Sequence, residues 1–330
     1  MTTLTEAGMP DARLAPDAAI AKPPSAVDRA FDRGVRFATL AFACLVIALV
    51  TYIVLKIAWT ARPAVGRFGA SLLTATTWDT NRDLFGLLPA IWGTLYTSIL
   101  GLAIGTFFGL SIAIVLSQDF LPPAIETVLK NLIELLAAIP SVVYGLWGIF
   151  VVIPAIRPAA TWLNDHLGWI PLFGTPLRGP GVLPASVVLA IMVLPTVSAL
   201  SREALLAVPS KIKEAAYGLG ATRWEAILGV LVPTALTGIV GSIMLGFGRA
   251  LGETMALAML VGNANEISVS LFSPGTTLAA LLALNFPEAK GAEAQVLMYA
   301  ALVLLAITLA VNVIGTAIVT RASRQHRGAR

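Results

Sequence analysis

Long apolar runs separated by shorter polar segments dominate the hydropathy pattern of this chain. A helix needs about 20 predominantly apolar residues to cross the hydrocarbon core of a bilayer, and six runs approach or exceed that length. They cover residues 37–58, 88–116, 134–153, 182–201, 237–261 and 294–320. Between them, residues 60–87 are expected to form a polar linker and residues 262–294 a polar loop. The pattern therefore predicts an all-α membrane protein with six transmembrane helices within a domain spanning residues 35–320.

The two ends of the chain are polar. Residues 1–34 contain scattered prolines and few large apolar side chains, which predicts a disordered tail because such a segment has little to bury. Residues 321–330 form a basic tail that carries Arg321, Arg324, Arg327 and Arg330. With six spans, both tails lie on the same side of the membrane.

The distribution of positive charge predicts which side that is. The tails, together with residues 117–133 and 202–225, hold most of the 22 Lys and Arg residues. Because cytoplasmic segments of membrane proteins are enriched in Lys and Arg, both termini are predicted to be cytoplasmic. The formal net charge of +4 is thereby explained by topology and gives no reason to expect a nucleic-acid partner.

Composition supports the membrane class and excludes some chemistry. Only 12% of the residues are charged, and 57% are hydrophobic, whereas soluble domains carry about 25% charged residues. The single cysteine, Cys44, cannot form a disulfide within the chain. His166 and His326 are too few and too far apart in sequence to suggest a metal site.

A charged pair lies inside the fifth apolar run. An arginine at the centre of a membrane span costs about 2.5–3.5 kcal/mol on insertion scales, so Arg249 is expected to have a function. If the run is one continuous helix, Glu253 lies on the same face four residues later. Two interpretations remain open. Arg249 meets an anion in a pathway, with Glu253 tuning that contact, or the two charges neutralise each other and hold helices together.

The predicted helix has two contrasting sides. Small and polar residues gather around Arg249, and the polar residues Ser242 and Thr254 join the charged pair as candidate pathway residues. The side that includes Arg249 carries Gly238, Ser242, Gly252, Glu253 and Ala256. The opposite side suits lipid and carries Val240, Ile243, Met244, Phe247 and Leu251.

The third span contains a proline. Pro140 removes one backbone donor and predicts a kink or an interruption of the helix. Irregular backbone within a membrane is tolerated where it lines a cavity or is covered by protein. Pro140, Ser141 and Tyr144 are therefore candidate pathway residues, and a purely structural kink is the alternative.

Glycines recur every four residues in the second span, at Gly101, Gly105 and Gly109. Such a ridge allows a second helix to approach closely. The alternative is that glycine is simply common in membrane helices.

The segment 202–225 has helix signals of its own. Pro209 and Ser210 predict the start of a short helix over 211–217, and Gly218 and Gly220 predict its end. Thr222 and Glu225 then have the spacing of a capping box, which predicts a second helix. A soluble partner could bind a short helix of this kind, although a solvated connector has a similar composition.

These residues resemble a known motif. Glu214-Ala-Ala, followed by Gly220 and by Val230-Leu-Val-Pro233, is similar to the EAA loop of ABC importer permeases. The residues that match are Glu214, Ala215, Ala216, Gly220 and Pro233. The resemblance implies a type I ABC importer permease fold, in which residues 202–233 form a coupling loop seated in a groove of an ATPase subunit.

Two further phrases narrow the family. Residues 138–148 (AIPSVVYGLWG) and 248–256 (GRALGETMA) are similar to permeases of phosphate-specific importers, and residues 85–98 resemble the PstC type rather than its PstA-type partner. The resemblance implies a multi-pass subunit of the bacterial inner membrane with Arg249 and Glu253 on the phosphate path. It also implies four kinds of contact: a PstA-type permease, two ATPase subunits, a periplasmic phosphate-binding protein and membrane lipid.

The chain contains no Gly-x-x-x-x-Gly-Lys-Ser/Thr loop, so it is not expected to hold ATP or to act as an enzyme. No cofactor is expected on it, with ATP and Mg²⁺ assigned to the partner ATPase. Three alternatives stay open: a permease for molybdate, sulfate or phosphonate, an ion-coupled secondary carrier that uses Glu253, and a non-transporting scaffold subunit.

Overall fold

The computed structural model of the chain describes residues 26–327, which are helical and contain no β-strand. Five helices are long and apolar enough to cross a membrane, and a sixth span exists if two helices that meet at 70°, Arg223–Thr234 and Leu236–Gly252, count as one. The predicted all-α membrane class is confirmed. The chain divides into two compact units, Met1–Leu55 and Lys56–Arg330.

The first helix, α1 (Ala26–Phe68), is longer than the predicted span 37–58. Residues 26–34 belong to this helix, so the prediction that they are disordered is wrong, while residues 1–25 of the predicted tail lie outside the described residues. Helix formation there has a local reason, since Asp32 and Arg36 have the i,i+4 spacing of a favourable pair. At its other end α1 also continues ten residues beyond residue 58, into the segment predicted to be a linker.

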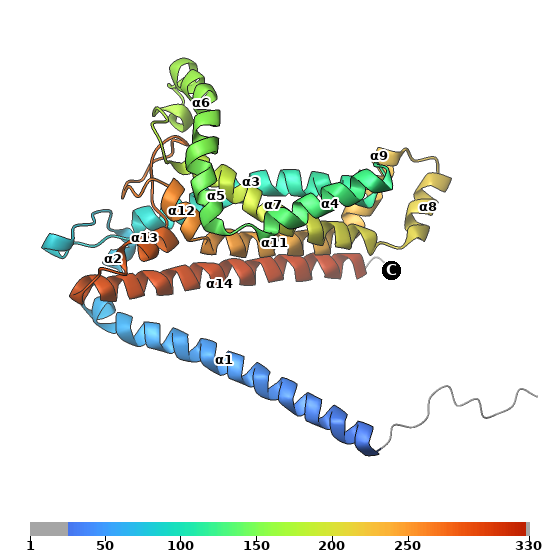
Figure 1. Ribbon diagram of the computed structural model, residues 1–330, viewed down its shortest axis with the longest axis horizontal. Coiled ribbons are helices and arrows are strands. Elements are labelled where there is room, and N and C mark those ends of the chain that lie inside the picture. Colours follow the sequence, from blue (N-terminus) through green and yellow to red (C-terminus); the bar gives the residue numbers. More distant parts are fainter. Residues whose placement is uncertain (1–25, 328–330) are drawn as a thin grey trace, which may run out of the picture. The chain divides into compact units, whose positions relative to one another are not determined.

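Four helices form the main bundle of the second unit: α3 (Leu88–Ser117), α7 (Val182–Leu206), α11 (Leu236–Gly252) and α14 (Gly291–Arg327). They run side by side in Figure 1, and α11 packs against the other three. The basic tail predicted from residue 321 continues α14 as helix to Arg327.

The glycine ridge explains the close contact between α3 and α7. A Cβ atom on Gly105 would lie 2.9 Å from the carbonyl oxygen of Ala190, and one on Gly101 would lie 3.0 Å from the Leu189 side chain. Gly109 similarly faces Val197. The three glycines therefore act as the ridge that the sequence predicts, because any larger side chain would push α7 away.

The third span has the interruption predicted at Pro140, but its bounds differ from 134–153. The chain forms α4 (Pro123–Ala138), a break, and then α5 (Ser141–Trp147), a π-helical turn η2 (Gly148–Val152) and α6 (Ile153–Leu167). The break occurs because Ile139 precedes a proline and takes an extended backbone, with φ −69° and ψ 127°. The helix long enough to span is Ser141–Leu167.

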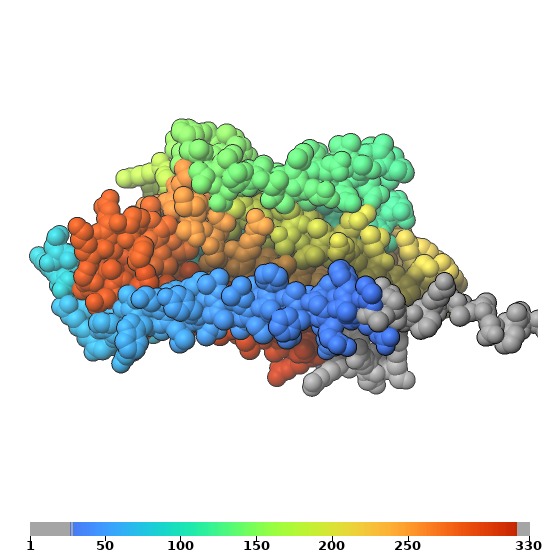
Figure 2. All heavy atoms as spheres, turned by 60° about the horizontal axis from the view of Figure 1, so that its bottom comes forward, coloured from blue at the N-terminus to red at the C-terminus, as the bar shows by residue number. Residues whose placement is uncertain are grey.

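This interrupted segment gives the second unit an uneven surface. In Figure 1, α5 and α6 cross the direction of α3, α7 and α14 instead of running along it. In Figure 2, the green segments that contain α4 and α6 stand out from one face with a hollow between them. Residues from the α4–α5 break also line a groove, which matters for the site.

The two segments predicted as polar loops, 60–87 and 262–294, are largely folded into the protein. Leu72 and Leu87 from the first segment and Leu278 from the second are completely buried against Leu297 of α14. A Cβ atom on Gly93 would overlap the Thr276 carbonyl, which shows how closely α3 approaches the second segment. The apolar run Leu278-Ala-Ala-Leu-Leu is the signal that the loop interpretation overlooked.

The remaining elements are short. They are α2 (Ser71–Thr74), η1 (Thr80–Arg82), η3 (Pro171–Phe173), α8 (Ser210–Gly218), α9 (Arg223–Ala226), the π-helical turn η4 (Ile227–Leu231), α10 (Val232–Thr234), α12 (Met255–Leu260) and α13 (Leu278–Asn285). In Figure 1, α8 and α9 lie at one end of the bundle, and α12 and α13 lie toward the other.

Candidate substrate pathway and coupling segment

The fifth span is broken beside the charged pair. Helix α11 ends at Gly252, Glu253 has an extended backbone with φ −66° and ψ 126°, and α12 starts at Met255. The Thr254 hydroxyl donates a hydrogen bond of 3.0 Å to the Gly252 carbonyl, which satisfies an acceptor exposed by the end of the helix. The prediction of one continuous helix over 237–261 is therefore wrong.

The break separates Arg249 from Glu253. The expectation that they share a helical face required a helix through residue 253, and no ion pair joins them among the ion pairs of residues 26–327. Arg249 is exposed and Glu253 is half-buried. Mutual neutralisation of the two charges consequently does not describe this conformation.

One face of α11 is left uncovered by the other described residues of the second unit. We call it the open face, and its residues are Gly241, Leu245, Arg249 and Gly252. A Cβ atom on Gly241 or Gly252 would meet no other atom within 4 Å, and Leu245 is 58% exposed. The side predicted to suit lipid is instead partly packed into protein, since Leu251 is 1% exposed and Ile243 joins two core clusters.

Ser242 does not lie on the open face. Its hydroxyl is 2.7 Å from the Ser201 hydroxyl on α7, and it also donates to the Ile239 carbonyl at 2.7 Å. Ser242 is 1% exposed. On an ideal helix Ser242 and Arg249 point in nearly the same direction, so α7 covers this side of α11 at Ser242 and leaves it free at Arg249.

Tyr144 lies on α5, beside the break that follows α4. The buried Tyr144 hydroxyl donates a hydrogen bond of 2.7 Å to the Leu136 carbonyl, which ties α5 to α4 across the break. Ser141 is half-buried and Pro140 is exposed. The Pro140 carbonyl accepts a hydrogen bond of 3.0 Å from the Val143 amide and so starts α5.

A groove of about 270 Å³ opens beside this break. Its lining residues are Leu136, Ile139, Val143, Tyr144, Trp147 and Ile191. These side chains are apolar apart from the aromatic hydroxyl and the indole, so the groove offers little to an anion. Across residues 26–327, no group of three or more His, Cys, Asp or Glu side chains is arranged to hold a metal ion.

The coupling segment 202–233 contains the predicted helix, glycine break and second helix. Helix α8 ends in two hydrogen bonds typical of a left-handed helix cap, from the Ala221 amide to the Ala216 carbonyl at 3.1 Å and from the Gly220 amide to the Tyr217 carbonyl at 2.9 Å. Gly220 has φ +86°, a conformation that favours glycine. The capping box of Thr222 and Glu225 is also present.

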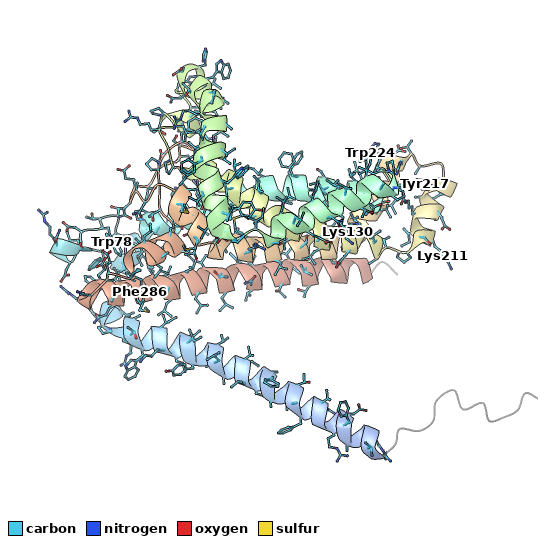
Figure 3. All side chains as sticks on the ribbon, in the orientation of Figure 1. Trp78, Lys130, Lys211, Tyr217, Trp224 and Phe286 are labelled. Atoms are coloured by element: carbon cyan, nitrogen blue, oxygen red, sulfur yellow. The ribbon has the colours of Figure 1, made fainter. Side chains whose placement is uncertain are left out.

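The candidate coupling residues differ in exposure. Glu214 and Ala215 are exposed on α8, Ala216 is buried, and Pro233 is half-buried in α10. Figure 3 shows Lys211, Tyr217 and Trp224 gathered at this end of the molecule, far from Trp78 and Phe286. Sequence reasoning missed Leu219, which is 90% exposed. An apolar residue between two glycines in a polar loop was the available signal.

Membrane-spanning helices, an uncovered charged helix face and a helical segment projecting at one end define a membrane permease subunit. The family described as "Binding-protein-dependent transport system inner membrane component" matches residues 105–327. Its curated relatives include phosphate transport system permease proteins PstC. The Xylella fastidiosa (Temecula1) protein is 41% identical over 87% of this chain and 90% of its own length.

Two further relatives with the same function in their names come from distant organisms. The Haemophilus influenzae protein is 40% identical over 86% of this chain and 91% of its own length. The Methanocaldococcus jannaschii protein, named as a probable PstC, is 36% identical over 77% of this chain and 83% of its own length. The chain belongs to the PstC family of ABC transporter permeases, which are multi-pass inner-membrane proteins.

Solved transporter structures share the fold. A subunit of the MetNI methionine ABC transporter in an inward-facing conformation has a TM-score of 0.54 and 19% identity, covering 72% of this chain and 95% of that chain. A bacterial ABC transporter involved in alginate import has a TM-score of 0.58 and 14% identity, and the match covers 88% of this chain and 98% of that chain. These similarities confirm the ABC importer permease fold.

Proposed function

We propose that this chain is a permease subunit of an ATP-driven phosphate importer and forms one half of the translocation pathway. The exposed Arg249 on the open face of α11 is the observation that carries this proposal. Relatives at 36–41% identity that are named as phosphate permeases support the choice of substrate.

The open face requires a partner other than lipid. An arginine facing hydrocarbon is costly, by about 2.5–3.5 kcal/mol on insertion scales, whereas small residues allow another helix to pack closely. Both features occur together on α11, where Gly241 and Gly252 flank Arg249. We assign the open face to the contact with a second permease subunit of the PstA type, so that Arg249 lies at the seam between the two subunits.

The chemistry of Arg249 suits a travelling phosphate. Its guanidinium can make paired, charge-assisted hydrogen bonds to an oxyanion. Transport also requires release, and Glu253 is placed to assist it. Because Glu253 lies in the break just after α11, a change at this break would move its carboxylate relative to Arg249. Pairing of the two charges would then compete with bound phosphate.

Energy would come from two ATPase subunits that bind the coupling segment through α8, where Glu214, Ala215 and Leu219 are exposed. ATP and Mg²⁺ would be held by those subunits, with no cofactor on this chain. A periplasmic phosphate-binding protein would deliver the substrate at the opposite end of the bundle. Closure of the ATPase pair would move the coupling segment and alternate the access to Arg249 between the two sides.

The experiment is uptake of radiolabelled phosphate into vesicles that contain the complete transporter, with sulfate and molybdate as competitors. Arg249→Ala is expected to abolish uptake while the complex assembles. Arg249→Lys, which keeps the charge but lacks the guanidinium fork, is expected to retain a small part of it. The matched control is Arg62→Ala, which removes an exposed arginine on α1.

Normal phosphate uptake by an assembled Arg249→Ala transporter would contradict the role of this residue. Stronger inhibition of uptake by molybdate or sulfate than by unlabelled phosphate would favour another oxyanion as substrate. Uptake without any ATPase subunit, driven by an ion gradient, would favour a secondary carrier.

A further inference from the structure

Helix α3 ends beside the coupling segment, and its last carbonyl groups have no partners within the helix. The final turn of any α-helix presents unsatisfied carbonyl oxygens and the negative end of the helix dipole. Here two arginines of the coupling segment, one at its start and one at the start of α9, meet these oxygens. The Arg202 Nε donates to the Leu116 carbonyl at 3.1 Å, and the Arg223 guanidinium donates to the Gln118 carbonyl.

Arg202 also reaches a third helix. Its guanidinium forms an ion pair of 2.9 Å with Glu126 in the first turn of α4, and both side chains are largely covered, at 23% and 29% exposure. Arg202 lies near the end of α7. This single side chain therefore joins α7 to the end of α3 and to the start of α4.

Arg223 contacts an aromatic ring in addition to the Gln118 carbonyl. Its guanidinium lies 3.8 Å from the centre of the Phe120 ring, and the Trp224 ring lies 5.3 Å from that same ring. Lys213 of α8 adds an ion pair of 3.7 Å with Asp119. The residues gripped by these contacts, 118–120, form the turn between α3 and α4. The left-handed backbone of Asp119, with φ 53°, shapes this turn.

Helix α8 depends on such side-chain contacts for its position. It packs mainly against α9 and η4, which belong to the same coupling segment. Its two ends are the Pro209 connection to α7 and the cap at Gly218–Gly220, where glycine places few steric limits on the backbone. Without attachments to α3 and α4, α8 could rock on these ends and leave the bundle where it is.

We propose that Arg202 and Arg223 form a clamp that transmits the movement of the coupling segment to α3 and α4. They are positioning residues and do not touch the substrate. Through α3 the movement reaches α7, because the glycine ridge locks the two helices together, and through α4 it reaches Tyr144, which is bonded to Leu136 across the break. This inference rests on the proposed function, since it assumes that an ATPase moves α8.

The experiment measures phosphate uptake and ATP hydrolysis by the complete transporter in vesicles, and the readout is phosphate transported per ATP hydrolysed. Arg202→Gln and Arg223→Gln are each expected to lower this ratio about tenfold, in keeping with the loss of hydrogen bonds from a charged donor. ATP hydrolysis is expected to continue. The matched control is Lys290→Gln, which lies outside the coupling segment, because Lys290 is exposed and has no hydrogen bond or ion pair among those of the described chain.

Two further variants separate coupling from folding. Exchanging the charges in one chain, with Arg202→Glu and Glu126→Arg, is expected to restore part of the ratio lost in Arg202→Glu alone. If a glutamine variant fails to assemble, Arg202→Lys and Arg223→Lys take its place, since lysine keeps the charge and one donor. An unchanged ratio in the assembled variants, or failure of the lysine variants to assemble, would overturn the clamp.

Different results would contradict the proposed function and the clamp. If the wild-type transporter hydrolyses ATP and carries another oxyanion, the substrate assignment is wrong, and the same ratio measured with that oxyanion still tests the clamp. If the wild type needs no ATPase, both proposals fall.

Discussion

At the scale of single residues, several hydroxyl groups inside the bundle hydrogen-bond a nearby protein acceptor. Ser201 and Ser242 bond to each other between α7 and α11, and Thr94 and Thr97 donate to carbonyls one turn earlier in α3. A hydroxyl in a dry interior needs such a partner, because leaving it unbonded is costly. The serine pair therefore joins α7 to α11 in this conformation, whatever its polarity suggests about a pathway, whereas the two threonine bonds stay within α3.

The serine pair gives a prediction. Ser242→Ala is expected to lower the stability of the chain by about 0.6–1.7 kcal/mol, the range found for hydrogen bonds between membrane helices. Ser201→Ala is expected to have a similar effect, and the double variant should cost less than the sum, because both partners of one bond are then removed. Thermal unfolding of the purified protein in detergent measures these differences.

Phosphate uptake by the same variants distinguishes a packing role of Ser242 from a role in the substrate pathway. Phosphate uptake per assembled transporter is expected to stay near the wild-type value in Ser242→Ala. A severe loss of uptake with normal stability would show that Ser242 contacts the substrate in another conformation.

At the scale of helices, α11 has one packed side and one open face. Gly246 lies on the packed side, where a Cβ atom would be 2.8 Å from the Val193 side chain, while a Cβ atom on Gly241 would meet nothing within 4 Å. The two glycines of this helix therefore have different structural roles. Gly246 makes room for α7, and Gly241 lies on the open face, where we propose that the second permease subunit packs.

This difference predicts opposite results for the same substitution. Gly241→Leu is expected to leave the thermal stability of the isolated chain within about 0.5 kcal/mol of wild type, as for surface changes, and to prevent co-purification of the second permease subunit. Gly246→Leu should destabilise the isolated chain by about 1–3 kcal/mol through overpacking. Normal co-purification with Gly241→Leu would place the second subunit on another surface.

Helix breaks also belong to this scale. Pro140 signals an interruption in the sequence, and the structure places it where Ile139 becomes extended. The break after Gly252 has no comparable local signal, because Gly252 and Glu253 are both tolerated within helices. Hydropathy predicts one span across α11 and α12, because Met255–Leu260 continues the apolar run.

At the scale of the whole molecule, charge separates the two ends of the bundle. The coupling segment carries Arg202, Lys211, Lys213 and Arg223 at one end, whereas residues 262–294 at the other end contain a single Lys or Arg, Lys290. The positive-inside rule predicts that the end with α8 faces the cytoplasm. This orientation stays a prediction from sequence.

Cysteine labelling tests it. In a Cys44→Ser background, Lys211→Cys and Glu288→Cys each introduce a thiol at an exposed position. A membrane-impermeant maleimide added to spheroplasts is expected to label Glu288→Cys and to spare Lys211→Cys. Inverted membrane vesicles should give the reverse. Labelling of Lys211→Cys in intact spheroplasts would place α8 outside and would remove the basis for coupling to a cytoplasmic ATPase.

Some features of this protein followed from the sequence because they depend on neighbours a few residues apart. Apolar runs marked the helical membrane class, Thr222 and Glu225 marked a helix start, Gly220 marked a helix end, and the spacing of Glu214 with Gly220 and Pro233 marked the family. The ridge of Gly101, Gly105 and Gly109 also followed, although its partner helix did not.

Only the tertiary structure decided which surfaces meet. It placed Ser242 against Ser201, left Arg249 uncovered, separated Glu253 from Arg249 and folded the segments 60–87 and 262–294 into the core. It also brought Arg202 and Arg223 to the end of α3, more than 80 residues away in sequence. The physical reason is that hydropathy measures preference for an apolar environment, and packing between distant segments determines whether lipid, another helix or a partner subunit provides it.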